Sequence, residues 1–145
     1  MDAIDRDILS ALERNARVSY RDLAERIGLS ANAVADRVRK LQERQVLRGF
    51  TADIDPVAFG LTLRALIEVK MESDTTAEQF EKRAAATPGV IRALVTTGRY
   101  DWVLEVLARD QKDLQRIIEA LRAGGLARDT YSRIIATDRR FGLNP

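Results

Sequence analysis

Apolar residues recur at helical spacing over the first third of the chain, and they predict three helices. Residues 2–15 place four apolar side chains on one helical face: Ile4, Ile8, Leu9 and Leu12. Residues 19–27 and 30–44 repeat this pattern with two further sets, Leu23, Ala24 and Ile27 in the first and Val34, Val38 and Leu41 in the second. Each helix therefore has one buried stripe, and three such stripes can close a small core.

A turn at Gly28 joins the second and third of these helices. Ser19 and Ser30 stand where a side-chain hydroxyl would cap each helix, and Gly28 stands where a positive φ would end the earlier one. Small Ala24 would let the two helices cross closely. This arrangement is typical of a helix-turn-helix, whose second helix lies in the major groove of DNA. The alternative is an ordinary helical hairpin with a solvated basic face, and the joint pattern favours DNA binding.

From residue 62 onward the pattern is that of a sheet covered by helices. Apolar and polar residues alternate over residues 62–71, which predicts a strand. Thr75 followed by Glu78 predicts a capping box at the start of a helix over residues 75–86. The other predicted elements are strands at 90–97 and 101–108, a helix capped by Asp110 and stopped by Gly124-Gly125, and a strand at 126–137. This βαββαβ order predicts a ferredoxin-like α/β sandwich with an antiparallel sheet.

A linker, residues 46–61, separates the two regions. Residues 46–54 suggest one extended segment or two short strands around Gly49, and the residues after Pro56 predict a brief turn ending at Gly60. The expected fold class is therefore α+β. The expected domains are a helix-turn-helix domain at 1–45, a linker strand and hinge at 46–61, and a ferredoxin-like domain at 62–145. A linker strand packed beside the helices would make the first domain a winged helix-turn-helix.

Both faces of the predicted sheet are apolar, although helices can cover only one of them. Val103 and Leu107 point away from the face that carries Trp102 and Leu104, and Leu66 interrupts the polar side of the first strand. A second copy of the sheet is the simplest cover for the remaining face. The sequence therefore predicts an obligate dimer.

Composition narrows the classes of function. The 145 residues include no histidine and no cysteine, which excludes Ser-His and Cys-His catalysis and any zinc site built on these ligands. Net charge is only +2, but residues 14–48 hold nine basic and four acidic side chains, a local excess of +5 that suits a phosphate-binding surface. No apolar run approaches the ~20 residues of a membrane span, and acidic residues interrupt any signal peptide near the N-terminus. We therefore expect a cytoplasmic protein that contacts no membrane.

The order of these elements resembles the Lrp/AsnC (feast/famine) family of prokaryotic transcription regulators. The match covers nearly the whole chain, and the motifs that carry it are IDRDIL at 4–9, NARVSYRDLAERIGLS at 15–30, RVRKL at 37–41, DPVAFGL at 55–61, PGV at 88–90 and TGRYDWVLEV at 97–106. The resemblance implies a homodimer, often an octamer built as a tetramer of dimers, that binds duplex DNA. It also implies that residues 62–145 bind a small effector, usually an amino acid, and oligomerise.

Two positions depart from the family pattern. Gln45 stands just after the recognition helix where the family usually has glycine, and a left-handed conformation there costs a non-glycine residue on the order of 1 kcal/mol. The helix is therefore expected to end differently here. Arg99 lies at a position that the family does not fix, and it would add a cation beside any effector.

The predicted recognition helix supplies candidates for DNA contact. Ser30 and the free N–H groups at the helix start can meet a phosphate. Asn32 is the candidate for a base edge, while Arg37 would contact guanine or phosphate, or else pair with Asp36 or Glu43. The full set of candidates is Arg17, Ser30, Ala31, Asn32, Arg37, Arg39 and Lys40. In a dimer, the two recognition helices would lie ~34 Å apart, one turn of DNA.

The turn between the second and third predicted strands supplies candidates for effector binding. Gly98 and Arg99 can offer backbone N–H groups to a carboxylate, and Asp101 can accept a hydrogen bond from an ammonium group. On spacing alone an ordinary hairpin turn, closed by Gly98 and capped by Asp101, is the favoured interpretation, and the family resemblance reverses this preference in favour of the effector site. The candidates are Thr97, Gly98, Arg99, Tyr100 and Asp101, with Thr130, Ser132 and Ile134 of the last strand around the effector side chain.

These features bear on three functions. The favoured one is a sequence-specific regulator gated by an amino acid, without cofactor or metal, acting at the nucleoid. The alternative is a low-specificity architectural DNA-binding protein with an effector-sensing domain. An enzyme is disfavoured because the sequence has no Gly-rich phosphate loop and no paired-carboxylate motif.

Overall fold

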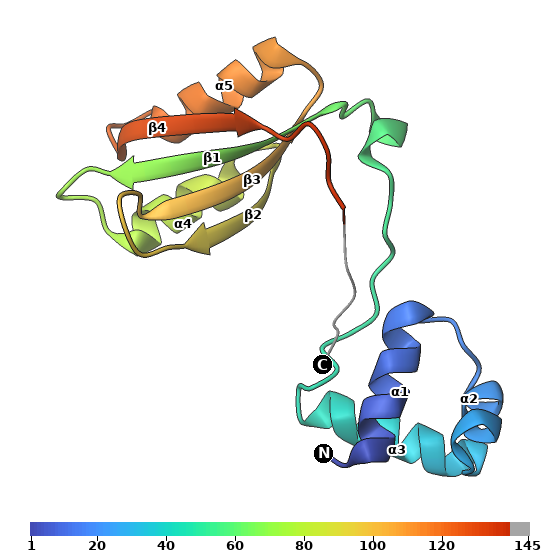
Figure 1. Cartoon of the computed structure of the whole chain (residues 1–145). Coiled ribbons are helices and arrows are strands. Elements are labelled where there is room, and N and C mark those ends of the chain that lie inside the picture. The colour runs from blue at the N-terminus through green and yellow to red at the C-terminus, as the bar shows by residue number, and fades with distance from the viewer. Residues whose placement is uncertain (140–145) are drawn as a thin grey trace. The chain divides into compact units, whose positions relative to one another are not determined.

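The computed structural model describes residues 1–139 and divides the chain into two compact units (Figure 1). The first unit contains Met1–Asp53 together with Arg139, and the second contains Ile54–Asp138. The division falls inside the predicted linker. Residues 140–145, which end the range predicted for the C-terminal domain, lie outside the described residues.

Three helices form the first unit: α1 Ala3–Arg14, α2 Tyr20–Ile27 and α3 Ala31–Glu43. Each begins at a side-chain cap. Asp2 and Asp5 form a reciprocal capping box on α1, and the hydroxyls of Ser19 and Ser30 accept hydrogen bonds from the third backbone N–H of α2 and α3. Gly28 ends α2 at φ +70°. The predicted stripes meet in one core, which consists of Ile8, Leu12, Leu23, Ala24, Val34, Val38 and Leu41.

The end of α3 retains the left-handed turn despite its glutamine. Gln45 has φ +56°, the Val46 N–H donates to the carbonyl of Leu41, and the Gln45 N–H donates to the carbonyl of Gln42, both at 2.9 Å. This is the hydrogen-bond pattern of a glycine-terminated helix. The expectation that the helix ends differently is therefore wrong, and Gln45 carries the strain instead.

We expect Gln45→Gly to raise the free energy of unfolding of the first unit by roughly 0.5–1 kcal/mol, because glycine adopts positive φ without steric cost. Thermal unfolding followed by circular dichroism measures the change. Gln42→Gly is the matched control, since Gln42 lies inside α3, where glycine lowers stability by about 1 kcal/mol. Equal destabilisation by both substitutions would contradict the strain at Gln45.

The linker is less regular than expected. Within residues 1–139, no helix or strand is formed between residues 46 and 55, so the predicted linker strand and wing are absent from the single chain. A strand requires a neighbour for its backbone N–H and C=O groups, and this chain supplies none there. The short turn is confirmed as a 3₁₀ helix, Pro56–Phe59, capped by the Asp55 carboxylate and closed by Gly60 at φ +73°.

The second unit is a four-stranded antiparallel sheet in the order β2-β3-β1-β4 with two helices (Figure 1). Its elements are β1 Leu63–Met71, α4 Ala77–Ala86, β2 Val90–Val95, β3 Trp102–Ala108, α5 Gln111–Arg122 and β4 Ala127–Ile134. The predicted βαββαβ order is confirmed. The predicted capping box is wrong by one residue, because Thr76 and Gln79 form it rather than Thr75 and Glu78.

One face of this sheet packs on α4 and α5, and its core includes Ile67, Phe80, Leu104 and Leu121. The opposite face, which we call the open face, is given by strand alternation. Apolar residues on it are Leu66 of β1, Leu94 of β2, Val103 and Leu107 of β3, and Tyr131 of β4. Among the described residues, ion pairs accompany them: Arg64 with Glu105 and Asp138, Glu68 with Arg133, and Lys70 with Asp101. Nothing within the described second unit covers this face.

Candidate functional sites

The outward face of α3 is set by the stripe that the helix buries. Val34, Val38 and Leu41 are each no more than 2% exposed. At about 100° per residue, four exposed side chains lie within about 60° of one another on the opposite side of the helix. These residues are Asn32, Asp36, Arg39 and Glu43. Lys40 flanks this set, whereas Ala31 and Arg37 lie closer to the buried stripe.

Arg37 faces α1 and is engaged there. Its Nη1 donates to Asp2 Oδ2 and to Asp5 Oδ1, at 2.7 Å each. The hydrogen bond from Arg37 is the main reason that the pKa of Asp5 lies below its ordinary value. For Asp2, the backbone N–H of Asp5 lowers the pKa most, and Arg37 adds to it. The pairing predicted as an alternative, with Asp36 or Glu43, is wrong, since a residue beside the buried stripe points toward the neighbouring helix.

The other predicted DNA-contacting residues fall into two groups. Ser30, Ala31 and Asn32 lie together at the exposed start of α3, where the Ser30 oxygen accepts from the Ala33 N–H at 3.2 Å. Arg39 and Lys40 lie about two turns further along the helix, both exposed. Arg17 lies in the connection between α1 and α2, where its backbone N–H donates to the Asn15 side chain.

Arg39 is paired, and Lys40 is not. Arg39 Nη2 lies 2.8 Å from Asp36 Oδ1, and its Nε lies 3.8 Å from Glu43 Oε1. All three side chains are more than 60% exposed. Lys40 has no acidic partner in the part of the chain that the structure describes. Sequence reasoning missed Asp36 and Glu43 as members of this face, although their spacing of three and four residues from Arg39 was the available signal.

The loop between β2 and β3 is closed by its own hydrogen bonds. Thr96 donates from its N–H to the carbonyl of Asp101 and from its hydroxyl to the carbonyl of Tyr100, at 2.9 and 3.1 Å. The N–H of Asp101 donates to the Val69 carbonyl at 2.9 Å, which ties the loop to β1. Thr97, Gly98 and Arg99 stay exposed, with Gly98 at φ +115°.

The Asp101 carboxylate already has two partners. Its Oδ1 accepts from Lys70 Nζ and its Oδ2 from the Met71 N–H, both at 2.8 Å. The Lys70 hydrogen bond lowers the pKa of Asp101 most, followed by that of Met71. Both partners belong to β1, so the carboxylate ties the loop to that strand and makes neither contact within its own turn. Sequence reasoning missed Lys70, because 31 residues separate it from Asp101 and only the sheet register brings the two together.

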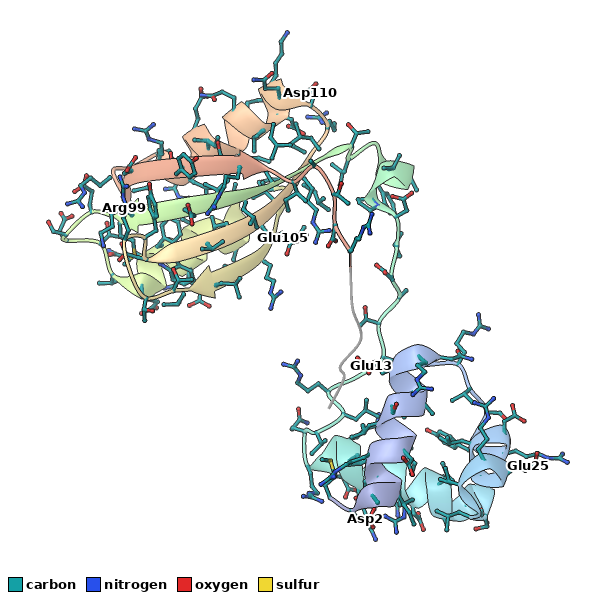
Figure 2. All side chains as sticks on the ribbon, viewed as in Figure 1. Asp2, Glu13, Glu25, Arg99, Glu105 and Asp110 are labelled. Carbon is teal, nitrogen blue, oxygen red and sulfur yellow. The ribbon has the colours of Figure 1, made fainter. Side chains whose placement is uncertain are left out.

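The remaining effector candidates are unevenly placed. The Arg99 guanidinium lies 5.3 Å from the centre of the Tyr100 ring, and Figure 2 shows Arg99 at the end of the sheet that carries this loop. Thr130 pairs with Val69 at the same end. Ser132 and Ile134 pair with the residues two and four positions before Val69 in β1, so Ile134 lies ~13 Å from Thr130 along the strand. One chain therefore brings Thr130, but not Ile134, to the loop.

Two general features bear on function. In residues 1–139, no group of three acidic, histidine or cysteine side chains could hold a metal ion. Over the same residues, no helix is both long enough and apolar enough to cross a membrane.

Comparison with known proteins identifies both units. Residues 1–42 match the AsnC-type helix-turn-helix domain, and residues 64–137 match the Lrp/AsnC ligand binding domain. The HTH-type transcriptional regulator AldR of Mycolicibacterium smegmatis is 38% identical over all of this chain and 86% of its own length. The leucine-responsive regulatory protein of Rhizobium meliloti is 37% identical over 85% of this chain and 81% of its own length.

Solved structures agree with this assignment. The crystal structure of MtbAldR is 33% identical, covers all of both chains and has a TM-score of 0.75. A transcriptional regulator of Neisseria meningitidis in complex with L-Met shares the fold, with a TM-score of 0.90 at 24% identity over 98% of this chain and 94% of its own. The chain therefore belongs to the Lrp/AsnC family, as a DNA-binding transcription regulator with a C-terminal ligand-binding domain and no enzymatic role.

Proposed function

We propose that this regulator binds duplex DNA as a homodimer and that an amino acid controls it from the C-terminal domain. The main support for a dimer is the open face of the sheet. It combines half-buried and exposed apolar side chains with ion pairs between neighbouring strands, and a second copy would cover both. The two copies then present two recognition helices to successive turns of the major groove.

Further assembly of dimers into an octamer would use a different surface. The outer strand β2 has one unpaired edge, because it bonds only to β3. Ile91 and Val95 on this strand are 53% and 72% exposed. Val95 directly precedes the loop at residues 96–101, so dimers that met along this edge would enclose the predicted effector loop.

The DNA-contacting residues follow from the faces of α3. Ser30 and the free N–H groups at the helix start bind a phosphate, Asn32 reads a base edge beside Ala31, and Lys40 binds phosphate. Arg17 contacts the backbone from the α1–α2 connection. Arg37 positions α3 against α1, since both aspartates that it bonds belong to the start of α1.

Asn32→Ala should lower discrimination at one base pair of each half-site by ~1–3 kcal/mol. Lys40→Ala is the matched control, and it should weaken binding to all duplexes alike, with a smaller dependence on salt. Selection from a duplex library with a randomised centre measures both. An unchanged base preference in the Asn32 variant would favour the alternative, an architectural protein of low specificity. Because its ligand is chromosomal DNA, we place the protein in the cytoplasm, at the nucleoid.

An amino acid would be held by the loop at residues 97–101. Its carboxylate would accept from the exposed N–H groups around Gly98 and from Arg99, and its ammonium would donate to lone pairs of Asp101 left free by Lys70 and Met71. Thr130 lies nearest on β4. Ser132 and Ile134 lie further along that strand. They would contact only the side chain of a long effector, or an effector that is bound by a neighbouring copy. The relative solved with L-Met supports this effector class.

Thermal shift measurements across the twenty amino acids test this proposal. An effector present at one hundred times its dissociation constant stabilises the folded protein by ~2.7 kcal/mol. Calorimetry on Gly98→Ala, Arg99→Gln and Asp101→Asn should then show weaker binding of whichever amino acid stabilises the parent. Arg99→Gln keeps the loop contacts of Asp101, so it separates effector binding from hairpin stability. Unchanged affinity for that amino acid in all three variants would show that the loop is not part of the effector site.

A further inference from the structure

The outward face of α3 carries two carboxylates, which is unexpected on a surface that contacts negatively charged DNA. Asp36, Arg39 and Glu43 together carry a net charge of −1, and each is well exposed. Carboxylates that face DNA are repelled by its phosphates, so this face adds nothing to non-specific attraction. The basic residues outside the face, such as Lys40, Arg44 and Arg48, supply that attraction instead.

The acidic residues do have a geometric effect, because they hold the Arg39 side chain. Asp36 Oδ1 accepts one N–H of Arg39 Nη2, and Glu43 Oε1 lies 3.8 Å from Nε. A guanidinium has five N–H groups, so both donors of Nη1 and one of Nη2 stay free. Two parallel N–H groups are what the O6 and N7 acceptors of guanine require.

We propose that Arg39 is a base-reading residue, that Asp36 positions it, and that the Asp36–Arg39 pair determines specificity for guanine at the expense of general DNA affinity. Neutralised by Asp36 and Glu43, Arg39 binds phosphates weakly, and its free donors are directed at a base edge. Asn32 and Arg39 are seven residues apart, ~10 Å along the helix, so they address different base pairs. The inference rests on the proposed DNA contact of this helix face, and it assigns Arg39 a role other than general phosphate binding.

The test is Asp36→Asn in the full-length chain, compared with the parent on two probes. These are the consensus duplex that the parent selects from a randomised library and a duplex of scrambled sequence. The neutral amide of this variant would hold Arg39 only weakly and would no longer repel phosphate. We expect affinity for the scrambled duplex to rise about threefold or more, while the ratio of consensus to scrambled affinity falls about tenfold. The loss should be confined to one guanine of each half-site.

Two further variants make the result specific. Asp36→Glu keeps a carboxylate three residues from Arg39 and should restore most of the base preference. Glu78→Gln removes the same charge from an exposed pair with Lys82 on α4, outside the helix-turn-helix, and should leave both affinities unchanged. A uniform rise in affinity for both duplexes by Asp36→Asn would overturn the positioning role, because it would show only lost repulsion.

The outcomes also separate this inference from the function on which it rests. If Asn32→Ala alters the base preference but Asp36→Asn and Arg39→Ala do not, the helix reads DNA without the pair. If none of the three variants alters the base preference, the outward face of α3 does not read bases. Both the proposed DNA contact of this face and the role of the Asp36–Arg39 pair would then be wrong.

Discussion

Val103→Glu is expected to convert the protein into a folded monomer and to lower its DNA affinity by about 100-fold or more. Val103 lies on β3 in the open face, paired with Glu68 on one side and Leu94 on the other. In the proposed dimer this position is buried between two sheets. A carboxylate there would be desolvated without gaining a hydrogen-bond or ion-pair partner, which disfavours the dimer. The DNA affinity falls because two linked recognition helices bind far more tightly than one.

Sedimentation velocity measures the oligomeric state, and fluorescence anisotropy measures DNA binding. In the single chain Val103 is only half-buried, so glutamate there leaves the fold intact, and circular dichroism verifies this. Lys112→Glu is the matched control, since it introduces the same side chain on an exposed position of α5. A Val103→Glu protein that sediments as a dimer would show that the open face is not the dimer interface.

Arg37→Ala is expected to lower the thermal midpoint of the helix-turn-helix unit by roughly 5 °C or more. The guanidinium bonds two carboxylates of α1, and the side chain of Asp5 is only 12% exposed. Removing Arg37 leaves Asp2 and Asp5 close together without a cation between them. Arg21→Ala is the matched control. Arg21 pairs with Glu25 on the same unit, but this pair is exposed and contributes little.

Acidification provides a second test of the same contact. Arg37 and backbone N–H groups hold the pKa values of Asp2 and Asp5 below their ordinary range. A carboxyl whose pKa is lower in the folded state contributes stability above the unfolded pKa of about 3.9, and this contribution is lost as pH falls through the folded value. The difference in thermal midpoint between parent and Arg37→Ala should therefore narrow below about pH 4. A constant difference down to pH 2 would show that Arg37 acts by packing alone.

Local features of this chain follow from the amino-acid sequence alone, because short-range interactions create them. The caps at Ser19, Ser30 and Asp110 bond to backbone N–H groups three residues later. The buried stripes follow from 3.6 residues per turn, and the βαββαβ order follows from alternation interrupted by helical spacing. Even the exception is local: Thr75 and Thr76 are adjacent capping residues, each followed by a suitable N3 partner, and the pattern does not choose between them.

Contacts between side chains that are distant in sequence are decided by the tertiary structure, because they depend on how the helices and strands pack. Arg37 meets Asp2 and Asp5 across 35 and 32 residues, because α3 crosses α1 with this side of the helix inward. Lys70 meets Asp101 because β1 and β3 pair in one register, and a shift of one residue would turn each strand's side chains to the opposite face. The linker at residues 46–55 shows the same dependence: its sequence favours a strand, but a strand exists only where a second backbone pairs with it.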